Sequence, residues 1–173
     1  MKSGENEIFD VVNERDEVIR RESRPEVHRL GLKHRAVHIF LTNARGEIFL
    51  QKRSSTKDTW PGAWDSSVSG HLDAGEGYDD AAVREVREEL GWKLPEALTP
   101  IVKIDACEET DQEFVRVYHG QAEGPFTLHQ EEIECGRWFS VLDVEALIDG
   151  PSVKAAASFR YIWSILKERR IFS

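Results

Sequence analysis

The sequence predicts an α+β domain in which helices are layered against a sheet. Short apolar segments bounded by turn-forming residues, which are typical of strands, occur together with longer segments that carry apolar residues at helical spacing. The two kinds of segment do not alternate regularly, which argues against a doubly wound parallel sheet. The chain has 173 residues, of which 40% are hydrophobic, and this suits one core rather than two full domains.

The N-terminal part is predicted to form a hairpin and a short helix. Apolar residues flank a polar turn at residues 13–16, so residues 8–21 are typical of a β-hairpin. Pro25 would lie in the first turn of a helix over residues 25–30, where proline is favoured. We therefore expect one domain with two parts, an N-terminal extension over residues 1–32 and a core over residues 33–173.

Further strands are predicted up to the start of an acidic segment. Residues 36–41 and 48–51 are largely apolar and lie on either side of an Asn-Ala-Arg-Gly turn, which is a second hairpin pattern. Residues 54–64 are rich in turn formers and are expected to form a loop. A short strand over residues 66–69 would then lead to Gly70.

The second half of the chain is predicted to contain helices as well as strands. We expect a helix that is capped by Asp79 or a neighbour, runs to Leu90 and ends at Gly91, a typical stop residue. The other predicted elements are paired strands over residues 100–106 and 114–121, a strand over residues 137–139, and helices over residues 143–148 and 154–169, the first ended by Gly150-Pro151.

Composition and charge exclude several classes of function. The net charge of −9 repels nucleic-acid backbones, so we expect no nucleic-acid partner. The polar start predicts no signal peptide, and no apolar run approaches the roughly 20 residues that a membrane span needs. Two cysteines, Cys107 and Cys135, are too few for a disulfide framework and are expected to be reduced. We therefore expect a cytoplasmic protein without a membrane partner.

Residues 70–92, with the sequence GHLDAGEGYDDAAVREVREELGW, carry the chemistry. At about 100° per residue, the stripe expected to face the core consists of Ala82, Val83, Val86 and Leu90. Glu85, Glu88 and Glu89 share the adjacent stripe at positions i, i+3 and i+4. Like charges at this spacing destabilise a helix in isolation. They are therefore either a solvated face or the ligands of a hard divalent cation such as Mg²⁺, which prefers oxygen.

Glycines and a charge pair favour the metal interpretation. Gly70 ends a predicted strand, so its carbonyl group could face the same cation, and glycine lets the backbone approach closely. Glu76 lies at the end of the loop and Arg84 on the helix, where an ion pair between them would fix the loop against the helix.

The pattern Gly70, five residues, Glu76, seven residues and then REVREELGW from Arg84 resembles the Nudix box, complete in its glycines, acids and arginine. Trp92 is a mild departure, since the family usually has an aliphatic residue there. The resemblance extends over about residues 33–163. It implies a Nudix αβα sandwich, with a mixed sheet between helices, and hydrolysis of a diphosphate joined to another group.

The resemblance also implies roles for the residues of the site. The implied metal ligands, for Mg²⁺ or alternatively Mn²⁺, are Glu85, Glu88, Glu89 and the Gly70 carbonyl. Arg84 and Glu76 are implied as supporting residues, and the general base is left open between Glu88, Glu113 and the 131–132 loop. The residues expected around the substrate, a small organic diphosphate, are Arg53, Lys57, His71 and Glu76.

Outside the box, the chain resembles the type I isopentenyl diphosphate isomerases, which share the Nudix fold. The similar segments are His34-Arg35-Ala36, Gln51-Lys52-Arg53-Ser54, Lys57, Trp60-Pro61-Gly62, Trp64 and Ser69-Gly70-His71. Arg53 and Lys57 match residues that contact the diphosphate. The second metal site of those enzymes is matched at or near His34, His71, Asp111 and Glu113, and His28 matches another ligand with the spacing shifted by one.

Two departures favour hydrolysis over isomerisation. The acid/base cysteine of the isomerases is Ser69 here, and a hydroxyl is far less acidic than a thiol, whose pKa is about 8.5. An isomerase arginine on the box helix is replaced by Glu85, which restores the hydrolase box. The chain therefore resembles the YfcD-like branch of Nudix hydrolases. An isomerase and a non-catalytic diphosphate-binding module stay as alternatives, and the sequence identifies neither the substrate nor a homodimer.

Overall fold

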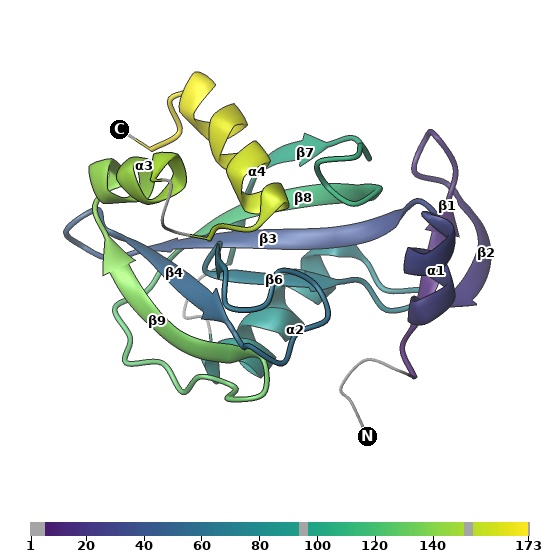
Figure 1. Ribbon diagram of the computed structural model, residues 1–173, viewed down its shortest axis with the longest axis horizontal. Helices are drawn as coiled ribbons and strands as arrows, with labels where there is room; N and C mark the ends of the chain where they lie inside the picture. Colours follow the sequence, from purple (N-terminus) through teal and green to yellow (C-terminus); the bar gives the residue numbers. More distant parts are fainter. Residues whose placement is uncertain (1–5, 94–96, 151–153, 173) are drawn as a thin grey trace.

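The computed structural model describes residues 6–93, 97–150 and 154–172 (Figure 1). The strands are β1 (Ile8–Val12), β2 (Val18–Ser23), β3 (His34–Thr42), β4 (Ile48–Arg53), β5 (Trp64–Asp65), β6 (Val68–His71), β7 (Thr99–Ile104), β8 (Glu113–Gln121) and β9 (Ile133–Phe139). The helices are α1 (Arg24–Leu30), α2 (Tyr78–Leu90), α3 (Val141–Asp149) and α4 (Ala157–Glu168). None of these helices, within the described residues, is long and apolar enough to cross a lipid bilayer.

Strand β3 is the centre of a seven-stranded mixed sheet. Its whole length pairs in parallel with β8, from His34 opposite Glu113 to Thr42 opposite Gln121. On its other side it pairs antiparallel with β6 at one end and with β4 at the other. Strands β3 and β8 begin, and β6 ends, at the same end of the sheet. The side chains of His34, His71 and Glu113, which are candidates from the sequence, therefore lie close together there.

Both faces of the sheet are buried under helices, as Figure 1 shows. Helices α3 and α4 cover one face, over a cluster that includes Phe40, Leu50, Val117, Phe159 and Trp163. Helix α2 covers the other face, over a cluster that includes Val37, Ile39, Val68, Val86 and Leu90. Side chains alternate along a strand, and β3 therefore supplies apolar residues to both layers. The predicted αβα sandwich is confirmed.

The N-terminal extension packs against the end of the sheet where β3 begins (Figure 1). Strands β1 and β2 pair as the predicted hairpin, and α1 packs on it through Phe9, Val11 and Val27. At the hairpin turn, the Asp16 carboxylate accepts hydrogen bonds from the Tyr78 hydroxyl (2.9 Å) and the Arg35 guanidinium (2.5 Å). The extension is thus fixed to the core by a polar anchor as well as by its own small apolar cluster.

Two predictions about α2 were wrong in detail. Gly77 is its N-cap residue and no side chain caps it among the described residues, because the Asp79 carboxylate instead accepts a hydrogen bond from the Tyr118 hydroxyl (2.5 Å). Val83 is 53% exposed and Ala81 is buried in its place. The buried face of α2 is centred on Ala82 and Glu89. One acid of the predicted acidic stripe, Glu89, is therefore itself buried against the sheet. The predicted end at Gly91 is confirmed by its left-handed φ of 59°.

Other element boundaries also differ from the prediction, among them those of α4, β9 and β6. Helix α4 begins at Ala157 rather than residue 154, because residues 154–156 run extended beside Trp64, with hydrogen bonds to its N–H and carbonyl groups. Strand β9 is four residues longer at its start, since Ile133 to Gly136 pair with β4. Strand β6 begins at Val68 rather than residue 66. Helix α3 ends before Gly150 as predicted, and Pro151 lies outside the described residues.

Candidate active site

The first feature of the site is the contact between the end of β6 and helix α2. Gly70 lies in the sheet opposite Val37, and a Cβ atom added to it would come within 2.1 Å of the Glu85 carboxyl carbon. Only glycine can occupy this position without displacing that carboxylate. The glycine therefore lets the first of the three box acids lie against the backbone of the strand.

Arg84 links the box loop, residues 72–77, to the acids of α2. Its guanidinium donates to both carboxylate oxygens of Glu76 (2.8 and 2.9 Å), which confirms the predicted pair. It also donates to the carbonyl of His71 (2.9 Å). On its other side it donates to Glu85 (2.8 Å) and Glu88 (3.1 Å). The planar guanidinium of Arg84 thus holds the loop and two acids at fixed positions relative to one another, because its donors have a rigid geometry.

Glu89 is the most deeply buried of the three acids, at 7% exposure. Its Oε2 accepts hydrogen bonds from the Gln51 side chain (2.9 Å) and the Ser69 backbone N–H (3.3 Å). Burial raises its pKa well above the ordinary value, and the charge of Glu85 raises it further. Gln51 was not assigned a role from the sequence, because its contact with Glu89 spans 38 residues.

The pKa of Glu85 is also raised. Burial, together with the charges of Glu88 and Glu7, raises its pKa to about 7 even though Arg84 acts in the opposite direction. Carboxylates that are crowded and desolvated in this way are stabilised in their charged form by a hard cation, and oxygen ligands are those that Mg²⁺ and Mn²⁺ prefer. The donor set of Glu85, Glu88 and Glu89 therefore fits a divalent cation.

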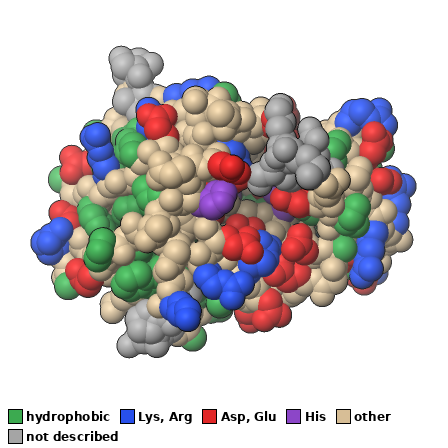
Figure 2. Space-filling view, turned by 90° about the horizontal axis from the view of Figure 1, so that it is seen from below, with side chains coloured by type: hydrophobic (Ala, Val, Ile, Leu, Met, Phe, Trp, Pro, Cys, Tyr) green, Lys and Arg blue, Asp and Glu red, His purple; other side chains and the backbone are tan. Residues whose placement is uncertain are grey.

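A cavity of about 820 Å³ opens beside these acids. Acidic and basic side chains and a histidine gather around a hollow in the face shown in Figure 2, and residues of these kinds line the cavity. Its lining includes the three box acids with Ser69, Gly70 and His71, and also Arg53, Lys57 and Trp60. This size suits a small organic ligand.

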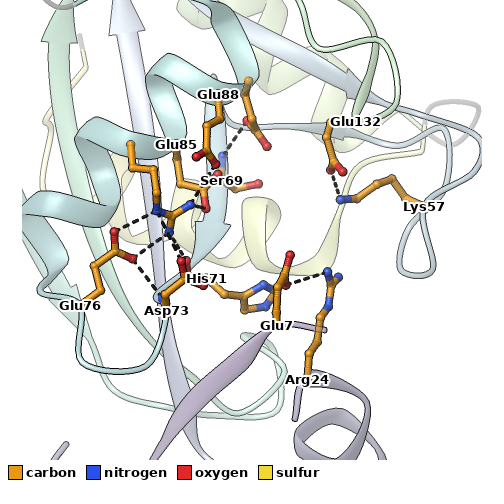
Figure 3. A network of polar contacts seen from close by, with 12 residues as sticks. Glu7, Arg24, Lys57, Ser69, His71, Asp73, Glu76, Glu85, Glu88 and Glu132 are labelled. Atoms are coloured by element: carbon orange, nitrogen blue, oxygen red, sulfur yellow. Dashed lines mark hydrogen bonds and ion pairs between the residues drawn. The ribbon is translucent and has the colours of Figure 1, made fainter. Parts of the chain in front are cut away.

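The two basic residues predicted to contact phosphate line the cavity but are held differently. The Arg53 guanidinium donates to the Asp65 carboxylate (3.2 Å) and to the Thr59 carbonyl (3.1 Å), so it is fixed by the protein itself. Lys57 forms an ion pair with Glu132, which reaches over from the segment before β9 (Figure 3). Lys57 is therefore the cation that an incoming phosphate could recruit by displacing Glu132.

A cluster of histidines lies next to the box acids, and two of its members, His28 and His71, line the cavity. Ligating nitrogens of His28, His34 and His71 lie within 4.8 Å of one another. The Glu113 carboxylate lies 2.9 Å from His71 Nε2 and 3.6 Å from His34 Nε2, and Asp111 lies 3.2 Å from His28 Nδ1. Within the described residues, the Nε2 atoms of His28 and His34 are buried without a hydrogen-bond partner. The shifted spacing of His28 in the sequence does not keep it from joining this cluster.

The charge state of Glu113 is set by these neighbours. Burial alone would raise its pKa, but the hydrogen bond with His71 and the charges of His34 and His71 hold the pKa far below its usual range. Burial lowers the pKa of His71 to about 4. Two imidazoles beside an ionised carboxylate are a donor set typical of a borderline metal ion such as Zn²⁺. The structure thus places Glu113 with the histidines rather than with the box acids.

Comparison with known proteins identifies the pattern. The NUDIX domain family matches residues 32–159. The uncharacterized Nudix hydrolase YfcD of Escherichia coli is 32% identical over 83% of this chain and 79% of its own length. The isopentenyl-diphosphate Delta-isomerase 2 of Photorhabdus laumondii is 29% identical over 83% of each chain. A crystal structure of DR0079 from Deinococcus radiodurans, 29% identical, covers 92% of this chain and 98% of its own, with a TM-score of 0.83.

Proposed function

The chain belongs to the Nudix hydrolase family, whose members cleave pyrophosphate bonds, and on that premise we propose that it hydrolyses a small organic diphosphate with a divalent cation held by Glu85, Glu88 and Glu89. The observation that carries this proposal is the cluster of three carboxylates, crowded at the wall of a cavity, with the pKa of two of them raised. The cation we propose is Mg²⁺, with Mn²⁺ as a substitute. When bound, it neutralises phosphate charge and activates the attacking water.

The other residues of the site support positioning and proton transfer. Arg84 and Glu76 hold the loop and the acids in register. Lys57, released from Glu132, would bind a phosphate oxygen, since lysine is a usual partner of phosphate. We assign the general base to Glu88, which accepts from Arg84 through one oxygen and whose side chain is 52% exposed beside the cavity. Glu113 is a weaker base, because its histidine partners stabilise its charged form.

The Glu89→Gln variant tests the cation site. The amide keeps the shape of the side chain but removes the charge, so we expect turnover of any diphosphate substrate to fall at least about 100-fold while the fold is retained. The measurement is phosphate or nucleoside monophosphate release with Mg²⁺ or Mn²⁺. The panel of substrates should include nucleoside di- and triphosphates, nucleotide sugars, ADP-ribose, dinucleotides and prenyl diphosphates. Asp80→Asn, the same charge change at an exposed position of α2, is the matched control. Unchanged turnover by Glu89→Gln would refute the assignment.

We further propose that the histidine cluster binds a second metal ion. Two buried nitrogens that have no hydrogen-bond partner among the described residues, together with an ionised Glu113, support it. The test is the metal content of the protein after incubation with Zn²⁺ or Mn²⁺ and dialysis. His34→Ala should lose about one equivalent relative to wild type, whereas His119→Gln, a change at a histidine that contacts Thr42 instead, should lose none. Equal metal content in all three proteins would contradict a second site.

The isomerase alternative is tested by the same substrate panel. The histidine cluster and the relative from Photorhabdus laumondii favour it, but a hydroxyl at Ser69 lines the cavity where the isomerases carry a thiol. We expect isopentenyl diphosphate to be hydrolysed or left unchanged. Conversion to dimethylallyl diphosphate without phosphate release would overturn the proposed hydrolysis.

A further inference from the structure

The box loop, residues 72–77, is held by the N-terminal hairpin. The Ala74 N–H donates to the Ile8 carbonyl (2.9 Å), and the Gly75 N–H donates to the Asp10 carboxylate (2.7 Å). Two successive amides of the loop are therefore bonded to β1, which lies outside the matched residues 32–159. Strand β1 thus contributes to the site region although it is not part of the family pattern.

Asp10 is buried at this contact and accepts hydrogen bonds from both the box loop and β2. It is 7% exposed, its Oδ2 accepts from Gly75, and its Oδ1 accepts from the Arg21 guanidinium of β2 (3.2 Å). Gly75 has a φ of 85°, and a Cβ atom added to it would lie 3.3 Å from Arg21. A glycine in this region can adopt many backbone conformations. The charge-assisted hydrogen bond from its N–H therefore selects one of them.

The conformation of Gly75 determines where the next residue lies. Glu76 is adjacent in the chain, and its carboxylate accepts from the Asp73 N–H (3.0 Å) and from Arg84 (2.8 and 2.9 Å). Arg84 in turn contacts Glu85 and Glu88. Asp10 is thus linked to Gly75 by a hydrogen bond, and Gly75 to Glu76 by the chain. Hydrogen bonds through Arg84 then connect Glu76 to Glu85 and Glu88. Outer contacts of this kind orient metal ligands and change affinity by about 10- to 100-fold.

We propose that Asp10 is a positioning residue for the cation site, acting through Gly75 and the box loop. The inference rests on the proposed function, because it gives Asp10 the task of holding the geometry in which the three acids bind their cation. It also gives the N-terminal hairpin a role in the site besides lining the cavity with Phe9 and Glu7.

Three variants separate the hydrogen bond from the ion pair. Asp10→Ala removes both contacts, Asp10→Asn keeps an oxygen for the Gly75 N–H, and Arg21→Ala removes only the ion pair. The Arg21 side chain is 64% exposed, so that pair alone is expected to contribute little. We expect Asp10→Ala to bind Mn²⁺ about tenfold more weakly. Asp10→Asn and Arg21→Ala should bind it within about threefold of wild type.

The measurements are Mn²⁺ binding by electron paramagnetic resonance without substrate, and amide hydrogen exchange of residues 72–77 in the metal-free protein. Faster exchange in Asp10→Ala than in Arg21→Ala is expected, and melting temperatures establish that each variant is folded. In the wild-type chain, the Gly75 amide should exchange as slowly as the amides of the hairpin. This result tests the contact even if Asp10→Ala does not fold.

The outcomes separate this proposal from the proposed function. Wild-type binding and exchange in Asp10→Ala, or an equal loss in all three variants, would overturn the positioning role and leave the cation site intact. Fast exchange of Gly75 in the wild-type chain would also overturn it. A wild-type chain that binds no Mn²⁺ would refute the cation site itself. Weakened Mn²⁺ binding in Asp10→Ala, without hydrolysis of any diphosphate, would support the positioning role and count against the enzymatic function.

Discussion

Because Gly70 has no side chain, the carboxylate of Glu85, a candidate metal ligand, can lie against the strand. A Cβ atom there would overlap the Glu85 carboxyl group, so Gly70→Ala should push this carboxylate out of the site. We predict a loss of about 100-fold in kcat/KM, the effect of a misplacement of about 1 Å. The measurement is steady-state hydrolysis with saturating Mg²⁺.

The control for this variant is Gly77→Ala. Gly77 has an ordinary φ of −89°, and an added Cβ atom would meet only Asp80 Oδ2 at 3.6 Å. Its activity should stay close to that of the wild type. An equal loss in both variants would mean that the loop in general, rather than the contact with Glu85, is sensitive to added methyl groups.

The predictions from sequence were strongest for these residues of the box. Glu76 and Arg84, eight positions apart, were expected to pair and do so, because both lie in one local loop-and-helix segment. Gln51 and Asp10 were not found, because their contacts with Glu89 and Gly75 span 38 and 65 residues and leave no local pattern. The roles of the site residues stay predictions until they are measured.

At the scale of elements, two segments meet across the cavity through Lys57 and Glu132. On the proposal that Lys57 binds a phosphate oxygen, the substrate competes with Glu132 for Lys57, so removing each partner should have opposite effects on KM. Lys57→Ala should raise KM about tenfold, the cost of a lost charged hydrogen bond. Glu132→Gln should lower KM by about threefold, as the ion pair is weakened. The measurement is KM and kcat for the best substrate of the panel.

A neighbouring ion pair provides the matched control for this element. Lys52 donates to Glu134 (2.8 Å) between β4 and β9, and neither residue lines the cavity. Lys52→Ala should leave KM unchanged. A rise in KM in Glu132→Gln as large as that in Lys57→Ala would show that the pair serves to hold the two segments together rather than to gate a phosphate site.

Element boundaries were predicted well where local signals define them and poorly where distant partners do. Gly91 ended α2 and the first two hairpins formed as expected, since turn residues act locally. The start of α4 was wrong because residues 154–156 bond to Trp64, about 90 positions earlier. Val83 was assigned to the core from helical spacing alone, which gives the width of a buried stripe but not its centre.

At the scale of the whole molecule, Asp16 anchors the N-terminal extension to the core. Its carboxylate is 6% exposed, and burial alone would raise its pKa. Hydrogen bonds from Lys103, Arg35 and Tyr78 outweigh burial and lower the pKa. A carboxylate with a lowered folded-state pKa contributes stability above its unfolded pKa of about 3.9, and that contribution is lost as the pH falls through the folded value.

Asp16→Asn isolates this charge, because asparagine also tolerates the left-handed φ of 62° at this position. We predict a loss of about 1–3 kcal/mol in the free energy of unfolding at pH 7. The difference from wild type should shrink as the pH falls below about 4. Urea unfolding at several pH values measures it. A difference that does not depend on pH would contradict a role for the carboxylate charge.

The layered architecture was predictable because the pattern of apolar residues indicated helices layered against a sheet, and the resemblance to the Nudix family implied the sandwich. The sandwich, with α2 on one face and α3 and α4 on the other, matches the expectation. A cytoplasmic location stays a prediction from sequence. The clustering of two donor sets at one cavity depends on β3, which places β6 and β8 on its two sides, and no local pattern specified it.

Anomalous diffraction from crystals grown with Mn²⁺ tests the central claim most directly. The account predicts a peak within coordination distance of Glu85, Glu88 and Glu89 carboxylate oxygens and of the Gly70 carbonyl, and predicts that this peak disappears in Glu89→Gln. A peak that is absent from this position in the wild-type chain, or that persists unchanged in the variant, would contradict the account.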